Sequence, residues 1–350
     1  MSRGPQVYTL DDGHDTRLQV MDIGATWLSC QVRAGDGRMR EVLLGHADPA
    51  AYLVEPGYLG AVIGRYANRI KDAAFDLEGR RFQLAANEGP NQLHGGPQGF
   101  DRRRWHVLES DALHVRMGLV SPDGDQGFPG EVTVSVSYRI DAPGRVVVVF
   151  EARTTAACPV NLTSHAYFNL DPKHDDSALD CRGHLIALQA SHYLPVDGAL
   201  IPTGVVAPVD GTAFDLRNGA RIGMQAFDHC FVIDPQAVGS TTPAARITSS
   251  DGLLSMAIST DYPGLQFYNG AHLGLARGRQ GRPYPAHAGF ALEPQYLPDS
   301  PNRPEWPQPS CILRPGEVLR RRMLLQFDAV TPAARPAAVP QSIANQESAA

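Results

Sequence analysis

Two side chains that lie far apart in the sequence could form an acid–base pair. His165 lies in the stretch 161–170, NLTSHAYFNL, and Glu293 follows the apolar segment 288–292. Partial removal from water raises the pKa of a carboxyl group, and a neighbouring carboxylate favours a protonated imidazole. Such a pair could move protons near neutral pH without a metal or another cofactor. Glu293 alone could equally be a carboxylate at a strand end that reaches solvent.

The stretch around His165 alternates in the way a β-strand requires. One face would be mostly apolar and suited to a core: Leu162, Ser164, Ala166, Phe168 and Leu170. The other face would carry neutral hydrogen-bonding groups around one histidine: Asn161, Thr163, His165, Tyr167 and Asn169. Such a face suits a concave site for a hydroxyl-rich ligand. Thr and Tyr are also ordinary strand residues, so the pattern favours a strand more firmly than a site.

A second histidine, His94, lies in the Gly/Pro-rich segment 87–100 and is followed by two glycines. Glycine lets backbone approach a ligand closely, although a solvated loop histidine explains the same pattern. Spacing alone does not separate a binding role from a structural one for four further polar residues: Asn68, Arg69, Asp228 and Gln266. The sequence has no nucleophile elbow, zinc-protease helix motif, P-loop or G-x-G-x-x-G spacing.

The elements that must position these residues are predicted to be short strands. Strands are expected at 131–140 and 146–150, at 75–84 around Glu78-Gly79, at 288–292 and at 318–327. Two more, 253–259 and 265–268, are expected to form a hairpin around Tyr262-Pro263-Gly264. With 34 glycines, 28 prolines and no long amphipathic helix, the chain is predicted to be an all-β sandwich or barrel. One domain is expected over residues 5–330, with a disordered tail at 331–350.

Composition excludes several functional classes. The net charge of −6 gives no electrostatic basis for binding nucleic acid or anionic membranes. Five scattered cysteines without a C-x-x-C pair favour neither a disulfide framework nor a zinc site. With no signal peptide and no long apolar run, a cytoplasmic protein is predicted. The short clusters Arg102–Arg104 and Arg320–Arg322 are better explained as loop or strand-end residues than as phosphate sites.

Seven segments together resemble one family, the aldose 1-epimerases or galactose mutarotases. They occur in the family's order over nearly the whole chain: GRYANRI at 64–70, NQLHGGPQGF at 91–100, NLTSHAYFNL at 161–170, FDHCFVID at 227–234, PGLQFYNG at 263–270, LEPQYLPDSPN at 292–302 and LRPGE at 313–317. Each segment is weak by itself, but the ordered set is specific. One departure is Pro294, which directly follows Glu293 and is expected to stiffen a turn there.

The resemblance implies a large antiparallel β-sandwich of the galactose-mutarotase type with a sugar cleft on one sheet. At the matching positions, Glu293 resembles the general base and His165 the general acid, while His94 would assist at the ring oxygen and anomeric centre. The sugar-binding groups would be Asn68, Arg69, Asp228 and Gln266. The implied reaction interconverts the anomers of a free galactose- or glucose-type aldose by ring opening and closure. It needs no metal or cofactor, and the implied assembly is a monomer or weak homodimer.

Two alternatives remain at the level of sequence. A hexose-phosphate epimerase of the same fold would need a cationic pocket, to which Arg69 and the cluster Arg102–Arg104 could contribute. A non-catalytic carbohydrate-binding sandwich would need hydroxyl contacts but not an acid–base pair. The presence of both His165 and Glu293 therefore argues against the second alternative.

Overall fold

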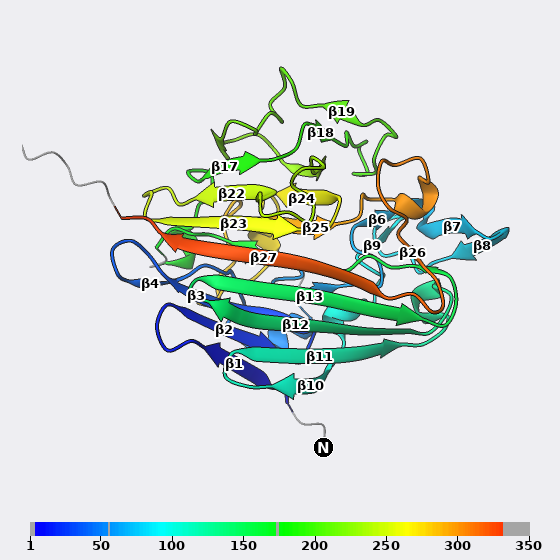
Figure 1. The fold of residues 1–350 in the computed structure, drawn as a ribbon, viewed down its shortest axis with the longest axis horizontal. Helices are drawn as coiled ribbons and strands as arrows, with labels where there is room; N and C mark the ends of the chain where they lie inside the picture. Colours follow the sequence, from blue (N-terminus) through cyan, green and yellow to red (C-terminus); the bar gives the residue numbers. More distant parts are fainter. Residues whose placement is uncertain (1–3, 55–56, 173–174, 332–350) are drawn as a thin grey trace, which may run out of the picture.

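The computed structural model describes residues 4–54, 57–172 and 175–331, which form β-strands and short 3-10 helices (Figure 1). The predicted all-β class is therefore confirmed. Within these ranges, no helix has the length and apolar character needed to cross a membrane. Residues 332–350 of the predicted tail lie outside the described residues. The 3-10 helices are η1 (Pro49–Leu53), η2 (Lys71–Ala73), η3 (Phe100–Arg102), η4 (Asp125–Gly127), η5 (Asp176–Ala178), η6 (Leu273–Leu275) and η7 (Ser300–Asn302).

The larger layer is an antiparallel sheet that has nine strands within the described ranges. In spatial order these are β10 (His106–Ser110), β11 (His114–Ser121), β12 (Val132–Ala142), β13 (Arg145–Thr154), β27 (Leu319–Ala329), β23 (Leu254–Thr260), β22 (Ala245–Thr248), β17 (Leu185–Leu188) and β20 (Ala220–Arg221). The predicted hairpin over 131–150 is confirmed as β12 and β13, which pair from Val132 with Thr154 to Ala142 with Arg145. Alternation of β-branched and polar residues along β12 gives it one buried face.

The second layer is an antiparallel sheet with six strands in the described part of the chain. Its order is β16 (Tyr167–Phe168), β25 (Phe290–Gln295), β24 (Gly264–Tyr268), β21 (Asp228–Val232), β18 (His192–Tyr193) and β19 (Ala207–Pro208). Phe231, Phe267 and Leu292 on one face of this sheet belong to the same buried cluster as Val148 and Leu325 of the larger sheet. The two sheets therefore pack as the expected antiparallel sandwich.

Shorter sheets complete the described chain. The strands β1 (Val7–Asp11), β2 (Thr16–Met21), β3 (Thr26–Arg33) and β4 (Met39–Glu41) form one antiparallel sheet. The paired strands are β5 (Val62–Ile63) with β15 (Thr163–Ser164), β6 (Arg69–Ile70) with β9 (Gln92–Leu93), β7 (Ala74–Leu77) with β8 (Arg80–Gln83), and β14 (Cys158–Pro159) with β26 (Ile312–Leu313). The pair β7 and β8 is the hairpin predicted around Glu78-Gly79.

The predicted hairpin around Tyr262-Pro263-Gly264 is wrong. Strand β23 pairs with β22 and β27 in the larger sheet, whereas β24 pairs with β21 and β25 in the smaller one. The turn therefore carries the chain from one layer to the other. Tyr262 anchors this crossing because its buried hydroxyl donates to the carbonyl oxygen of Leu162 at 2.5 Å. Turn residues specify a reversal of direction but not the partner of the following strand.

The sequence predicted one continuous strand over residues 161–170, and this prediction is wrong. Strand β15 pairs with β5 and strand β16 pairs with β25, so the chain changes partner at His165. Both predicted faces are buried, and the two asparagines at its ends have structural roles. The amide of Asn169 donates to the carbonyl oxygen of Ala288 at 2.7 Å. Some residues of the uncharged face therefore form internal hydrogen bonds, so this face does not serve only to line a cleft.

Asn161 makes the clearest of these internal contacts. Its amide donates to the carbonyl oxygens of Ala67 at 3.1 Å and Tyr296 at 3.4 Å, and its carbonyl oxygen accepts from the N–H of Tyr296 at 2.9 Å. We expect Asn161→Leu to lower the free energy of unfolding by about 3 kcal/mol, because buried backbone groups lose their partners. Urea unfolding measures this change.

The exposed Asn218 offers a matched control, since Asn218→Leu should alter the free energy of unfolding by less than about 0.5 kcal/mol. Equal stability of the Asn161→Leu and Asn218→Leu proteins would contradict the structural role of Asn161.

Candidate active site

The floor of the candidate site is set by strand register in the smaller sheet. Cys230 of β21, Gln266 of β24 and Glu293 of β25 lie directly opposite one another. Asp228, two residues before Cys230, shares their face, and its carboxylate accepts a hydrogen bond from Gln266 Nε2 at 2.6 Å. The intervening residues point into the core, so this polar face is turned away from the sandwich interior.

Glu293 lies inside β25 and does not end a strand. The strand continues through Pro294, so the expectation of a stiffened turn at this proline is wrong. The side chain of Glu293 is only 3% exposed. Burial raises its pKa to about 8, the charge of Asp228 adds to the increase, and Arg69 opposes it. The carboxyl group is therefore mostly protonated at neutral pH in the free protein.

His165 occupies the junction between β15 and β16. Its backbone N–H donates to the carbonyl oxygen of Ala61 at 2.9 Å, and its own carbonyl oxygen accepts from the N–H of Gly60 at 2.9 Å. These bonds hold the imidazole so that Nε2 lies 3.7 Å from Glu293 Oε1. Burial lowers the pKa of His165 to about 4. The expected imidazolium near neutral pH is thus absent from the free site, because desolvation outweighs the backbone hydrogen bond that raises the pKa of His165.

His94 follows β9 and brings a second imidazole to the site. Its ring centre lies 5.3 Å from that of His165. Its Nδ1 accepts a hydrogen bond from the backbone N–H of Asn68 at 3.2 Å, so the ring proton must reside on Nε2. Burial and the neighbouring His165 and Arg69 hold the pKa of His94 well below its ordinary value. His94 is therefore a neutral donor of one N–H.

Asn68 and Arg69 lie beside His94 because β6 pairs with β9. The side-chain oxygen of Asn68 accepts from the N–H of Arg69 at 2.8 Å. The Arg69 guanidinium binds both oxygens of Glu88, at 2.6 and 2.8 Å. Glu88 was missed at the level of sequence, since nothing in its spacing connects it with Arg69. The pair fixes a buried cation at the rim of the site and leaves it neutralised.

The predicted residues thus converge from three parts of the chain. Asp228, Gln266 and Glu293 come from the smaller sheet, His165 from the β15–β16 junction, and Asn68, Arg69 and His94 from the β6–β9 pair. Contacts link Asp228 to Gln266, Glu293 to His165, and His165 to His94.

Three of these residues could also be considered as metal ligands. His94, His165 and Glu293 offer ligand atoms that all lie within 4.8 Å of one another. Two imidazoles and a carboxylate suit zinc. A metal-bound imidazole usually donates its second ring N–H, whereas Nδ1 of His94 accepts from a backbone N–H. Because Nε2 of His94 then carries the proton, this donor chemistry favours proton transfer over metal binding.

Several buried polar atoms at the site have no hydrogen-bond partner among the described residues. They are His165 Nδ1, Gln266 Oε1 and Glu293 Oε2. Unpaired buried polar atoms cost free energy unless a ligand or water satisfies them. Their gathering around one acid–base pair indicates a site for a ligand with several hydroxyl groups.

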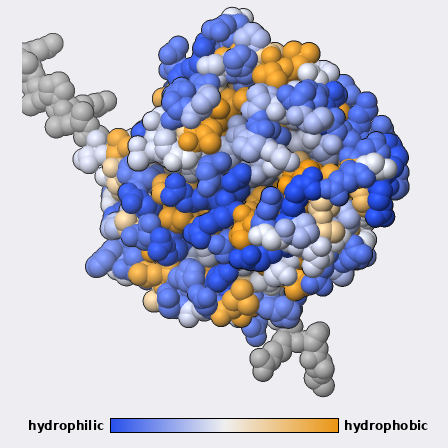
Figure 2. Space-filling model, turned by 45° about the vertical axis from the view of Figure 1, so that its right-hand side comes forward, coloured by the Kyte–Doolittle hydropathy of each residue, from blue (hydrophilic) through white to orange (hydrophobic). Residues whose placement is uncertain are grey.

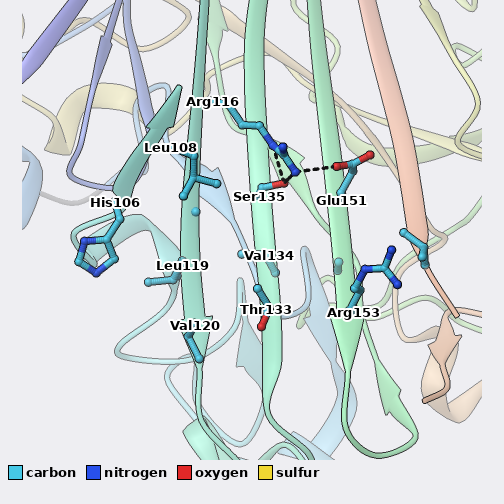
Figure 3. Close-up of a pocket in the computed structure, with 13 residues that line it drawn as sticks. His106, Leu108, Arg116, Leu119, Val120, Thr133, Val134, Ser135, Glu151 and Arg153 are labelled. Atoms are coloured by element: carbon cyan, nitrogen blue, oxygen red, sulfur yellow. Dashed lines mark hydrogen bonds and ion pairs between the residues drawn. The ribbon is translucent and has the colours of Figure 1, made fainter. Parts of the chain in front are cut away.

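A groove of about 320 Å³ on the outer face of β10–β13 provides a contrast (Figure 3). Arg116 crosses it to contact Ser135 Oγ at 3.4 Å and Glu151 at 3.1 Å. Arg116 therefore already has its partners inside this groove. The predicted site residues lie outside this groove, which offers no acid–base pair for chemistry.

Comparison with known proteins gives a consistent result. A family model described as aldose 1-epimerase matches residues 6–326. The aldose 1-epimerase of Escherichia coli (strain K12) is 42% identical over 335 residues, which cover 93% of this chain and 95% of that protein. The galactose mutarotase of Homo sapiens is 41% identical over 313 residues, which cover 86% of this chain and 88% of that protein.

Solved structures show the same architecture. An aldose epimerase homologue from C. elegans superimposes with a TM-score of 0.87 at 25% sequence identity, over 94% of this chain and 100% of that one. Galactose 1-epimerase from Lactobacillus acidophilus NCFM gives a TM-score of 0.78 at 26% identity, over 94% and 99% of the two chains.

Proposed function

Because the chain belongs to the aldose 1-epimerase family, we propose that Glu293 and His165 carry out the proton transfers with which it interconverts the anomers of an aldose. Membership of the family confirms the resemblance found in the sequence segments and the prediction of an isomerase. The observation that carries the proposal for the residues is the 3.7 Å contact between two buried titratable groups. Burial raises the pKa of Glu293 and lowers that of His165, so we expect the pair to hold one proton at neutral pH.

A pair with one proton suits this reaction because ring opening of a hemiacetal needs one acid and one base. In the free site the proton resides mainly on Glu293. Transfer to His165 creates a carboxylate and an imidazolium in contact, and hydroxyl groups of a bound sugar can donate to the carboxylate. Burial opposes this separation of charge in the empty site, whereas polar groups of the sugar favour it. Substrate binding thus prepares the reactive protonation state.

The chemical steps then follow from that state. Glu293 removes the proton of the C1 hydroxyl while His165 donates its proton to the ring oxygen, and the C1–O5 bond breaks to give the open aldehyde. Rotation about C1–C2 presents the other face of the carbonyl group. In ring closure, O5 attacks C1 and the O5 hydroxyl gives its proton back to His165. At the same time, Glu293 returns its proton to the oxygen on C1. The net change is inversion at C1, and both side chains recover their starting states.

The other predicted residues would bind and orient the sugar. His94 offers a fixed Nε2–H donor beside His165 and would support the developing charge at the ring oxygen. Asp228 and Gln266 are hydrogen-bonded to each other, Gln266 lies directly opposite Glu293, and Asp228 shares their face, so both suit hydroxyl contacts. Asn68 and Arg69 complete the rim on the side of His94. These are ordinary roles for such side chains in sugar recognition.

The arrangement favours a free aldose over a sugar phosphate. Arg69 is paired with Glu88, and each arginine of the cluster Arg102–Arg104 has a carboxylate partner: Asp101, Asp125 or Asp22. A phosphate group would have to compete with these carboxylates and would approach a site that already contains Asp228 and Glu293. The non-catalytic alternative also has less support, since hydroxyl recognition alone does not require a buried acid–base pair.

Removal of either member of the pair tests the proposal. We expect Glu293→Gln and His165→Asn each to lower kcat for galactose mutarotation by about 10³-fold or more, because each group supplies about 10²–10⁴-fold. Polarimetry measures the rate after subtraction of the spontaneous reaction.

Glu151→Gln is the matched control, since Glu151 lies on the outer face of the larger sheet and should be replaceable without loss of rate. Circular dichroism checks that each variant is folded. Near wild-type rates in a folded Glu293→Gln or His165→Asn protein would refute the assignment.

The pH dependence provides an independent prediction. In the active free enzyme, the pair Glu293 and His165 carries one proton. Above the pKa of Glu293 near 8 this proton is lost, and below the pKa of His165 near 4 a second proton binds. We therefore expect kcat/KM to be level between about pH 4 and 8 and to fall on both sides. Initial rates of mutarotation between pH 3.5 and 9.5 measure this profile. Activity that continues to rise through pH 9 would contradict the need for a proton on the pair.

A further inference from the structure

The turn Tyr58-Leu59-Gly60-Ala61 lies directly before β5, and the side chain of Tyr58 has no role in the function proposed so far. It is closed by a hydrogen bond from the Ala61 N–H to the Tyr58 carbonyl oxygen at 3.0 Å. Tyr58 has a φ of 57°, a conformation in which bulky residues are uncommon. Gly60 has a φ of 71°, and a Cβ there would lie 2.3 Å from the carbonyl oxygen of Trp27. The turn hydrogen bond and the close packing at Gly60 therefore hold the backbone of this turn in one conformation.

The same turn is tied to the backbone of His165. Gly60 donates to His165 and His165 donates to Ala61, each at 2.9 Å. As a consequence, the Tyr58 ring lies 5.8 Å from the His165 ring, centre to centre, with only 20° between the two planes. It also meets the His94 ring edge-on, at 4.7 Å and 65°. Tyr58 thus contacts both imidazoles of the site.

A second phenol ring takes part in this arrangement. Tyr167 lies 4.8 Å from His165 with an angle of 30° between the planes. The face of an aromatic ring attracts a cation within about 6 Å of its centre. Burial raises the pKa of Tyr58 to about 12, so its ring stays a neutral phenol over the working range. Both rings are thus placed to stabilise a positive charge on His165.

We propose that Tyr58 is a positioning residue that holds His165 against its ring and stabilises the imidazolium required for proton donation to the sugar. The idea deepens the proposed function, because the charge on His165 is the state from which ring opening begins. Tyr58 also lines a cavity of about 90 Å³, together with residues that include His46, Asp101 and Arg102.

Among the described residues, four titratable or aromatic side chains face His165, each from a different element that packs against it. Glu293 approaches from β25, His94 from the segment after β9, Tyr167 from β16 and Tyr58 from the turn before β5. Arg69 influences His94, and Asp228 influences Glu293. Replacement of Tyr58 by leucine changes one of these neighbours, keeps the position apolar and retains the other charged groups.

The test compares Tyr58→Leu with Tyr58→Phe in the full protein. We expect Tyr58→Leu to lower kcat about three- to tenfold with KM changed less than about twofold, and to lower the pKa of His165 by about half a unit. Tyr58→Phe keeps the ring face and should retain both values. Tyr8→Leu on β1 is a control, because Tyr8 is similarly half-buried but remote from the site. Polarimetry gives the rates, and an NMR titration of ¹⁵N-labelled histidine, assigned with His165→Asn, gives the pKa.

Two results would overturn the proposal. An unchanged or raised pKa of His165 in Tyr58→Leu would show that the ring does not stabilise the charge. Equal loss of kcat in Tyr58→Phe and Tyr58→Leu would assign the effect to the hydroxyl group. The NMR titration needs no substrate, so it reports on Tyr58 even if the proposed function fails, a failure that would appear separately as full activity of His165→Asn.

Discussion

The rest of the site depends on the 3.7 Å contact between Glu293 and His165, whose side chains are only 3% and 7% exposed. Desolvation favours the neutral form of each group. It raises the pKa of Glu293 to about 8 and lowers that of His165 to about 4, so the order of the two pKa values is reversed. The empty site therefore holds one proton and no charge separation on this pair. In the proposed mechanism, a sugar that satisfies the unpaired polar atoms reverses this preference and so couples substrate binding to the protonation state needed for ring opening.

The sandwich makes such a contact possible. One face of the six-stranded sheet packs in the core, and the other is free to carry Asp228, Gln266 and Glu293 in adjacent rows. The two histidines come from irregular segments whose backbones are held by specific hydrogen bonds. On the face drawn in Figure 2, the described residues form a mainly hydrophilic surface with small, separate apolar patches. The sheet supplies the floor of the candidate site, and the connecting segments supply its two histidines.

The sequence predicted the fold class, the strong local strands and the family, because these depend on alternation, turn residues and ordered motifs. It did not predict that the chain changes sheets at Tyr262 or changes strand partners at His165, since pairing is decided by contacts distant in sequence. It also predicted a protonated His165, because the sequence indicates a carboxyl partner but does not show how deeply His165 is buried. Glu88 and Tyr58 were missed for the same reason: only the folded backbone brings them to Arg69 and His165.

The most direct test is a ¹³C NMR titration of the side-chain carboxyl group of Glu293 in the free protein, with Glu293→Gln used to assign the signal. We predict a midpoint near pH 8, which would mean that the group is protonated at neutral pH and that the pair with His165 holds one proton. A midpoint near the ordinary value of 4.5 would mean that Glu293 is already ionised in the empty site. That result would contradict the claim that burial stores the proton on this pair until the sugar binds.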